Sequence, residues 1–230
     1  MAISIFTQVI KSSDFSQFWQ ELQEKFVGLP DYSSLPRTTL GRPYLAKHYP
    51  YGKQWLIDFN ISNSSSYTFI GLVISDSFLP YREQVFYIGV DLEKDFTLSE
   101  KAFTRRILSP LNKADYIDSP HARALEWVSK EAIIKSFSLS IFSGNKISFH
   151  KDYIALNDSM FNLQSEDNFL LTLSNWQGFI LGLCLINLPS FPTSISFNQD
   201  PLAIMPNTTH YQGIYKDSAP LLFSRIKKAT

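Results

Sequence analysis

The stretch WLIDFNISNSSSYTFIGLVI, residues 55–74, indicates most clearly how this chain folds. In its first half, apolar residues alternate with Asp58 and Asn60, which is the period-two pattern of a β-strand. Residues 62–66 are all serine or asparagine, a composition typical of a turn. Residues 67–74 are apolar on both faces, as in a buried strand. The stretch therefore predicts an antiparallel hairpin whose second strand lies centrally in a sheet.

Further strands and helices are expected around this hairpin. A third strand over residues 84–90 would extend it into an antiparallel meander. Apolar residues at helical spacing, together with capping patterns, predict three helices, over residues 15–26, 97–108 and 120–136. The fold class is therefore α+β, a mainly antiparallel β-sheet with packed helices, in a single domain over residues 1–230.

Short polar patterns mark where the first and third helices begin. Asp14 with Gln17 three residues later forms a capping pair for the first helix, and Gly28 suits its end. Ser119 followed by Pro120 combines a polar cap with a proline in the first turn, which predicts the start of the third helix.

Residues 137–149 predict a second hairpin, whose register follows from its apolar pattern. A three-residue loop pairs Ile141 with Ile147 and Leu139 with Phe149. Only this register buries both apolar rows on one face, so it is the one we expect.

In the C-terminal third of the chain, the sequence pattern determines the secondary structure less clearly. Residues 165–188 fit either one helix or two strands joined at 174–178, and we favour the helix. Residues 189–217 are expected to be irregular, and residues 219–228 are expected to form a short basic helix.

Composition and charge restrict the class of protein. The chain has Lys+Arg 21 against Asp+Glu 21, so it lacks the general positive charge of a nucleic-acid or membrane-surface binder. Its one cysteine, Cys184, lies between apolar residues and is expected to be a buried, unreactive thiol. A single cysteine and an N-terminus unlike a signal peptide favour the cytoplasm. No membrane partner is expected.

One segment departs from this neutral background. Residues 32–57 contain no acidic side chain, yet they carry four cations among several aromatic rings. Cations interleaved with rings suit an anionic or partly apolar partner. The alternative is plain packing, with tyrosines covering the sheet and cations solvating its rim. The candidate binding residues are Arg37, Arg42, Tyr44, Lys47, His48, Tyr49, Tyr51 and Lys53.

Patterns that would name a reaction are missing from the sequence. The four histidines are scattered without metal-ligand spacing, so no metal and no cofactor are expected. No serine-nucleophile elbow or phosphate-cradling glycine motif is present.

Two arrangements for catalysis remain as alternatives. Acidic residues near strand ends would hold Mg²⁺ for phosphodiester hydrolysis if they converge at one sheet edge. Alternatively, His48 or His150 would act as a general acid or base beside the cations of the acid-free segment. The acidic residues near strand ends are Asp58, Asp76, Asp91, Glu93 and Asp95.

The favoured function is therefore a cytosolic protein that binds another protein or an anionic macromolecule. A toxin-neutralising or mobile-element accessory protein of a bacterium would fit this description. The net charge does not point to nucleic acid as the partner. The alternative function is a phosphodiesterase or nuclease that acts on a phosphate-bearing substrate.

Overall fold

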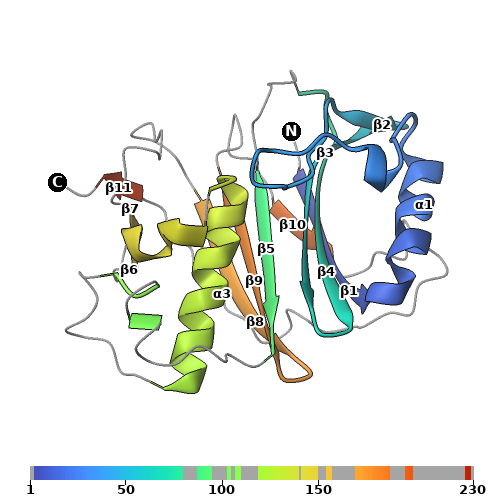
Figure 1. Cartoon of the computed structure of the whole chain (residues 1–230). Helices are drawn as coiled ribbons and strands as arrows, with labels where there is room; N and C mark the ends of the chain where they lie inside the picture. The colour runs from blue at the N-terminus through green and yellow to red at the C-terminus, as the bar shows by residue number, and fades with distance from the viewer. Residues whose placement is uncertain are drawn as a thin grey trace.

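The protein is built in layers, with one helix outside each of two facing sheets (Figure 1). Helix α1 (Phe15–Lys25) covers the outer face of a five-stranded sheet, and α3 (Pro120–Ser136) packs on the outer side of a three-stranded sheet. The computed structural model describes residues 3–79, 87–94, 103–104, 107–109, 119–139, 141–149, 154–156, 169–186, 195–198 and 226–228.

The five-stranded sheet contains the predicted central hairpin. Its strand order is β10-β1-β4-β3-β2, so β4 lies in the middle, as the sequence indicated. All neighbours pair antiparallel except β1 and β10, which pair parallel. The α+β class with mainly antiparallel sheets is thereby confirmed. The strands are β1 (Ile3–Lys11), β2 (Tyr49–Tyr51), β3 (Gln54–Ser64), β4 (Tyr67–Ser75) and β10 (Ile195–Asn198).

The second sheet has the order β5-β9-β8 and corrects two predictions. Its strand β5 (Ile88–Glu93) pairs with β9, so it does not continue the meander of β3 and β4. The helix favoured for residues 165–188 is wrong, because β8 (Phe169–Trp176) and β9 (Phe179–Ile186) form a hairpin. Both faces of β9 are buried, one against the first sheet and one against α3. A doubly buried strand lacks the alternation that separates strand from helix.

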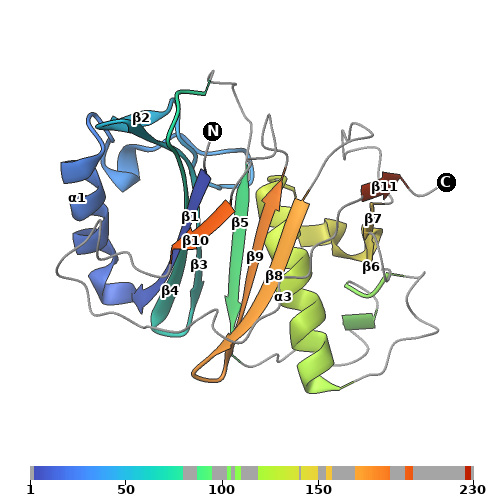
Figure 2. The same ribbon diagram turned by 180° about the vertical axis from the view of Figure 1, so that it is seen from behind.

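A third sheet, of order β11-β7-β6, lies beyond α3 (Figure 2). It contains β6 (Ile147–Phe149), β7 (Ile154–Leu156) and β11 (Ile226–Lys228). Residues 226–228 are thus a strand and not part of a helix; residues 219–225 lie outside the described part of the chain.

The hairpin expected over residues 137–149 is also wrong. A 3₁₀ helix occupies Ile141–Lys146, and β6 pairs with β7, which places Ile147 opposite Leu156. The end of α3 explains the difference: Ser138 adopts φ 54°, and the Leu139 N–H donates to Ile134 O at 2.9 Å. The residues expected to form the first strand are used to terminate the helix.

The two predicted helix starts differ in outcome. The Ser119 hydroxyl accepts a hydrogen bond from the Ala122 N–H at 3.0 Å, which confirms it as the cap of α3. Asp14 makes no side-chain capping bond, because a 3₁₀ turn over Ser12–Asp14 already brings it to φ −92°, ψ −2°. The helix expected over residues 97–108 lies mostly outside the described residues.

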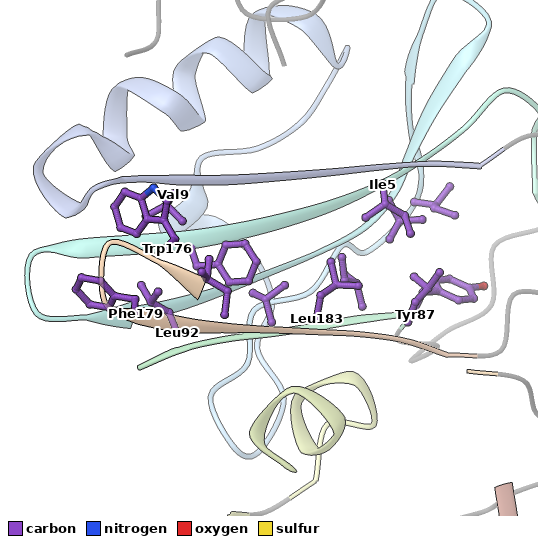
Figure 3. Packing of buried hydrophobic residues seen from close by; sticks show 14 of the residues in the cluster. Ile5, Val9, Tyr87, Leu92, Trp176, Phe179 and Leu183 are labelled. Carbon is purple, nitrogen blue, oxygen red and sulfur yellow. The ribbon is translucent and has the colours of Figure 1, made fainter. Parts of the chain in front are cut away.

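The main core lies between the two facing sheets, where side chains from both interdigitate (Figure 3). Val9 comes from the first sheet, and Leu92 and Leu183 come from the second. Removing one such side chain from water contributes about 1.5–3 kcal/mol to folding. This core fixes how β3 and β5, which belong to different sheets, lie beside each other.

Two glycines let α3 approach the second sheet closely. A Cβ atom on Gly89 of β5 would collide with the backbone at Ala132 and Ser136 of α3. On β9, a Cβ atom on Gly182 would lie 2.6 Å from Val128 Cγ1. These positions allow the helix backbone to lie against the sheet, and they bring its polar residues next to β5.

Candidate functional site

The polar face of β3 lies along the edge of β5. Asp58 Oδ2 accepts hydrogen bonds from the Tyr87 and Ile88 N–H groups at 2.8 and 3.0 Å, and Asn60 Oδ1 accepts from Val90 N–H at 3.0 Å. These side chains occupy the place of a neighbouring strand and satisfy backbone donors that would otherwise be buried unpaired. The polar alternation seen in the sequence therefore joins the two sheets.

Farther along the same two strands, β3 side chains contact carboxylates of β5 instead of its backbone. Ser62 Oγ donates to Asp91 Oδ1 at 2.8 Å, and Ser64 Oγ donates to Glu93 Oε2 at 3.3 Å. The two acidic residues are two positions apart on β5, so they share one face of the strand. That face is the one that meets α3 through Lys135.

Helix α3 adds a cation and a third carboxylate. The Lys135 Nζ atom lies 2.7 Å from Asp91 Oδ1 and 3.0 Å from Ser62 Oγ. Glu131 is one helical turn before Lys135 and therefore lies on the same side of α3. We refer to Asp91, Glu93 and Glu131 as the carboxylate cluster.

Burial and repulsion from neighbouring carboxylates disturb the titration of Glu93 and Glu131. Burial raises the pKa of Glu131 to about 7, with Asp91 and Glu93 adding to the rise and Lys135 opposing it. Burial, followed by repulsion from Asp91, also raises the pKa of Glu93. One ammonium group thus faces three acidic groups in a poorly solvated place, an arrangement that attracts a further cation.

Within the described part of the chain, one oxygen of the cluster has no hydrogen-bond partner. Asp91 Oδ2 is buried and unsatisfied, although Oδ1 of the same carboxylate accepts from both Ser62 and Lys135. The Asp91 side chain is 4% exposed, whereas that of Lys135 is 26% exposed, so the ammonium reaches solvent and the carboxylate does not. A buried carboxylate oxygen without a donor is costly and calls for an explanation.

Metal binding at the cluster depends on how its carboxylates are placed. Within the described ranges, no three histidine, cysteine, aspartate or glutamate side chains stand together in a set that would hold one as they are placed. Mg²⁺ does not need such a set, since it is usually bound by one or two carboxylates, substrate phosphates and several waters. Asp91 and Glu93, on one face of β5, supply two carboxylates of that kind.

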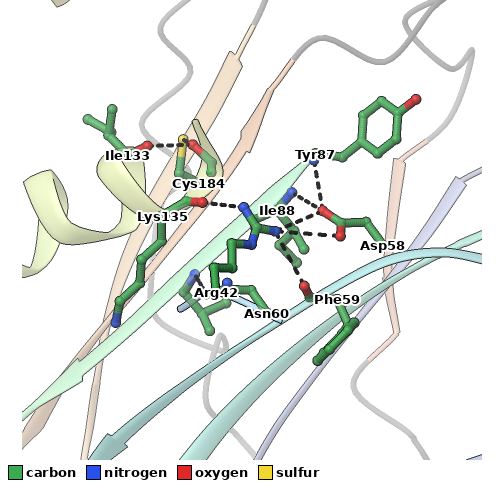
Figure 4. Close-up of polar contacts among 11 residues, drawn as sticks. Arg42, Asp58, Phe59, Asn60, Tyr87, Ile88, Ile133, Lys135 and Cys184 are labelled. Carbon is green, nitrogen blue, oxygen red and sulfur yellow. Dashed lines mark hydrogen bonds and ion pairs between the residues drawn. The ribbon is translucent and has the colours of Figure 1, made fainter. Parts of the chain in front are cut away.

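The acid-free segment does not act as one surface. Arg42 is buried, with its side chain 8% exposed, and its Nη2 lies 3.2 Å from Asp58 Oδ2 (Figure 4). Burial raises the pKa of Asp58, and Arg42 is the largest influence opposing that rise. Tyr49 is buried under α1, and His48 is buried with Nδ1 3.2 Å from Leu79 O. These three candidate binding residues are therefore interior.

The other candidate binding residues remain at least partly exposed. Arg37, Lys47, Tyr51 and Lys53 are exposed, and Tyr44 is half-buried. Two of the cations lie over rings: Arg37 is 5.3 Å from the Tyr32 centroid, and Lys47 is 5.6 Å from that of Tyr49.

The acidic residues singled out near strand ends do not all converge. Asp58 is neutralised by Arg42, and Asp76 is exposed beyond β4, where it accepts from Ser77 Oγ at 2.8 Å. Asp95 and His150 lie outside the described residues. Asp91 and Glu93 do lie on the same face of β5, and the structure adds Glu131, which the sequence analysis missed.

A signal for Glu131 was nevertheless present in the sequence. Trp127, Glu131 and Lys135 recur every four residues along α3. Such a row lies on one face of a helix. An acidic and a basic side chain within it therefore indicate polar groups opposite that face.

Comparison with known proteins does not assign a function to this site. No protein-family model matches the chain, and no curated protein sequence matches it. Of the helices in the described part of the chain, none is both long and apolar enough to cross a lipid bilayer.

Proposed function

We propose that this protein is an enzyme that uses a divalent cation to act on a phosphate-bearing substrate at the carboxylate cluster. The observation that carries the proposal is the buried, partnerless Oδ2 of Asp91 beside two further carboxylates. The proposal departs from the expectation, drawn from the sequence, that the chain holds no metal. It favours the phosphodiesterase-like alternative over the interaction protein.

The chemistry follows from the residues. Asp91 and Glu93 would hold Mg²⁺ or Mn²⁺, which leaves positions for phosphate oxygens and water. A bound cation polarises a phosphoryl oxygen and stabilises the charge that develops on a leaving oxygen. Lys135, already at the rim, supplies a second positive charge for the substrate phosphate.

Glu131 completes this arrangement. With a pKa raised to about 7, it exchanges its proton near neutral pH, which suits a general acid or base. The chain has a single cysteine and so no intrachain disulfide, which favours a reducing compartment such as the cytoplasm for this activity.

The test is phosphate release from a panel of phosphomonoesters, phosphodiesters and phosphoanhydrides. We expect turnover of at least one class with Mg²⁺, loss of that turnover with EDTA, and loss of it in Asp91→Asn. Asp76→Asn is the matched control, because Asp76 is exposed and outside the cluster. Turnover that survives both EDTA and Asp91→Asn would overturn the proposal, as would the absence of Mg²⁺-dependent turnover across the panel.

A second candidate function rests on the exposed part of the acid-free segment. Lys47, Lys53 and Tyr51 are exposed around β2, the edge strand of the first sheet. We propose that they contribute to binding an acidic macromolecular partner, through charge-assisted hydrogen bonds and ring contacts. Replacing Lys47 and Lys53 with alanine would then weaken capture of a polyanionic matrix, whereas Lys11→Ala on β1 would not.

A further inference from the structure

We propose that Arg42 is a positioning residue for the carboxylate cluster. The proposal rests on the function proposed above, because it assigns to Arg42 the task of setting the geometry in which that cluster binds its cation. Arg42 touches neither substrate nor cation; it acts through the two elements that carry the cluster.

The guanidinium group of Arg42 joins three elements of the fold (Figure 4). Its Nη1 donates to the Lys135 carbonyl in the last turn of α3. Its Nη2 donates to Ile88 O of β5 at 3.0 Å, to Asp58 Oδ2 at 3.2 Å and to Phe59 O at 3.4 Å. A planar group with several fixed donors is suited to such a junction, and a lysine ammonium is not.

Two of these contacts, those to Lys135 and Ile88, lie close to the cluster along the chain. The residue whose carbonyl Arg42 binds, Lys135, is also the residue whose ammonium contacts Asp91. Ile88 lies on β5 three residues before Asp91. Arg42 therefore ties the backbone of α3 to the backbone of β5 immediately beside the acidic groups that each element contributes.

The loop that carries Arg42 is itself held in place. Thr38 N–H donates to Arg42 O at 2.9 Å, and Arg42 N–H donates to Thr38 Oγ1 at 3.1 Å. Gly41, at φ 83°, closes the turn in a left-handed conformation that glycine adopts without strain. The backbone that carries the Arg42 side chain is thus held in a hydrogen-bonded turn.

The positioning role has a consequence that a purely stabilising role lacks. If Arg42 only stabilised the fold, its replacement would lower the melting temperature but leave the cation affinity of the folded protein unchanged. If it positions the cluster, the affinity falls even where the variant is fully folded. Groups that hydrogen-bond to metal ligands typically change metal affinity by about 10–100-fold when they are replaced. Arg42 acts through the backbone of α3 and β5 instead, so we expect an effect at the lower end of that range.

The experiment measures the Mn²⁺ dissociation constant by electron paramagnetic resonance, far below the melting temperature of each variant. We expect Arg42→Lys to bind Mn²⁺ about tenfold more weakly than the native chain, with an unchanged circular dichroism spectrum. Lys11→Arg, a charge-conserving change at an exposed site on β1, is the control and should bind like the native protein.

A second variant covers the case in which Arg42→Lys fails to fold. The double replacement Arg42→Gln with Asp58→Asn removes both charges of the buried pair together, which is far less damaging than removing one. It still lacks the bridge to α3, so we expect the same tenfold loss. A folded variant with native Mn²⁺ affinity would overturn the positioning role alone. A native protein that binds no Mn²⁺ would overturn the proposed function, and the positioning role with it.

Discussion

The Nζ atom of Lys135 lies 2.7 Å from Oδ1 of Asp91 and forms the ion pair that connects α3 to β5. The pair is asymmetric, because the carboxylate is almost fully buried while the ammonium reaches solvent. The second oxygen of the Asp91 carboxylate, Oδ2, has no hydrogen-bond donor within the described part of the chain. Glu131 adds further negative charge nearby. The ion pair therefore neutralises only part of the charge that the fold gathers there.

Replacing Lys135 with methionine tests this charge balance. Asp91 would remain buried without its cation, so we expect the free energy of unfolding to fall by about 1–3 kcal/mol in urea titrations with EDTA present. Mn²⁺ should bind more tightly than to the native chain, since a competing positive charge is gone. Lys11→Met provides a control for the loss of an exposed lysine. Weaker Mn²⁺ binding in Lys135→Met would show that the lysine does not compete for the site.

The raised pKa of Glu131 predicts a specific dependence of stability on pH. Its pKa in the folded state is about 7, above the ordinary value of 4.5, so the folded protein binds this proton more tightly than the unfolded chain. The resulting stability is complete below pH 4.5 and is lost as the pH rises through about 7. This shift corresponds to about 3 kcal/mol.

Glu131→Gln isolates this contribution, because glutamine cannot ionise. In melting experiments with EDTA, we expect the variant to match the native chain near pH 4.5 and to melt at a higher temperature at pH 8. The difference between the two proteins cancels the titration of groups that do not interact with Glu131. A difference in melting temperature that stays constant across this range would contradict the account.

Gly89→Ala tests the close packing of α3 on β5. The added Cβ would meet backbone atoms of α3, which cannot rotate away, so we expect a loss of about 1–3 kcal/mol in the free energy of unfolding. Gly71→Ala is the matched control, since its Cβ would meet only side-chain atoms of Ile88 and Val90. Equal losses in the two variants, measured by urea unfolding, would show that the helix is not held at this distance.

The local sequence pattern was sufficient to predict the hairpin of β3 and β4. It was insufficient to predict which strand pairs with β5. Residues 55–74 carry their own period, whereas the pairing of β5 with β9 depends on which apolar faces meet in the folded protein. The sequence of β8 and β9 also fits a helix, because both faces of β9 are buried. An apolar run of that length carries no period to distinguish the two.

The candidate site was visible only in part from the sequence. Asp91 and Glu93 stood out at a strand end, but the third carboxylate comes from a helix that the sequence does not place beside that strand. The charge of Arg42 was equally visible, yet its burial depends on Asp58 lying opposite it. The sequence shows which residues are charged, and the tertiary fold determines which of them form ion pairs.

The thiol of Cys184 is expected to be inert in the native protein. It is fully buried, accepts a hydrogen bond from Ser136 Oγ at 3.3 Å, and burial raises its pKa to about 12. We therefore expect negligible labelling by a disulfide reagent at pH 8 and complete labelling in denaturant. Labelling of the native protein at the denatured rate would contradict this placement.

Direct titration with Mn²⁺, followed by electron paramagnetic resonance, tests the central claim most directly. The native chain should bind Mn²⁺ at one site, Asp91→Asn should abolish that binding, and the exposed Asp76→Asn should leave it unchanged. Mg²⁺ should displace the bound Mn²⁺, because both prefer carboxylate oxygens. A native chain that binds no Mn²⁺, or binds it equally well without the Asp91 carboxylate, would contradict the account.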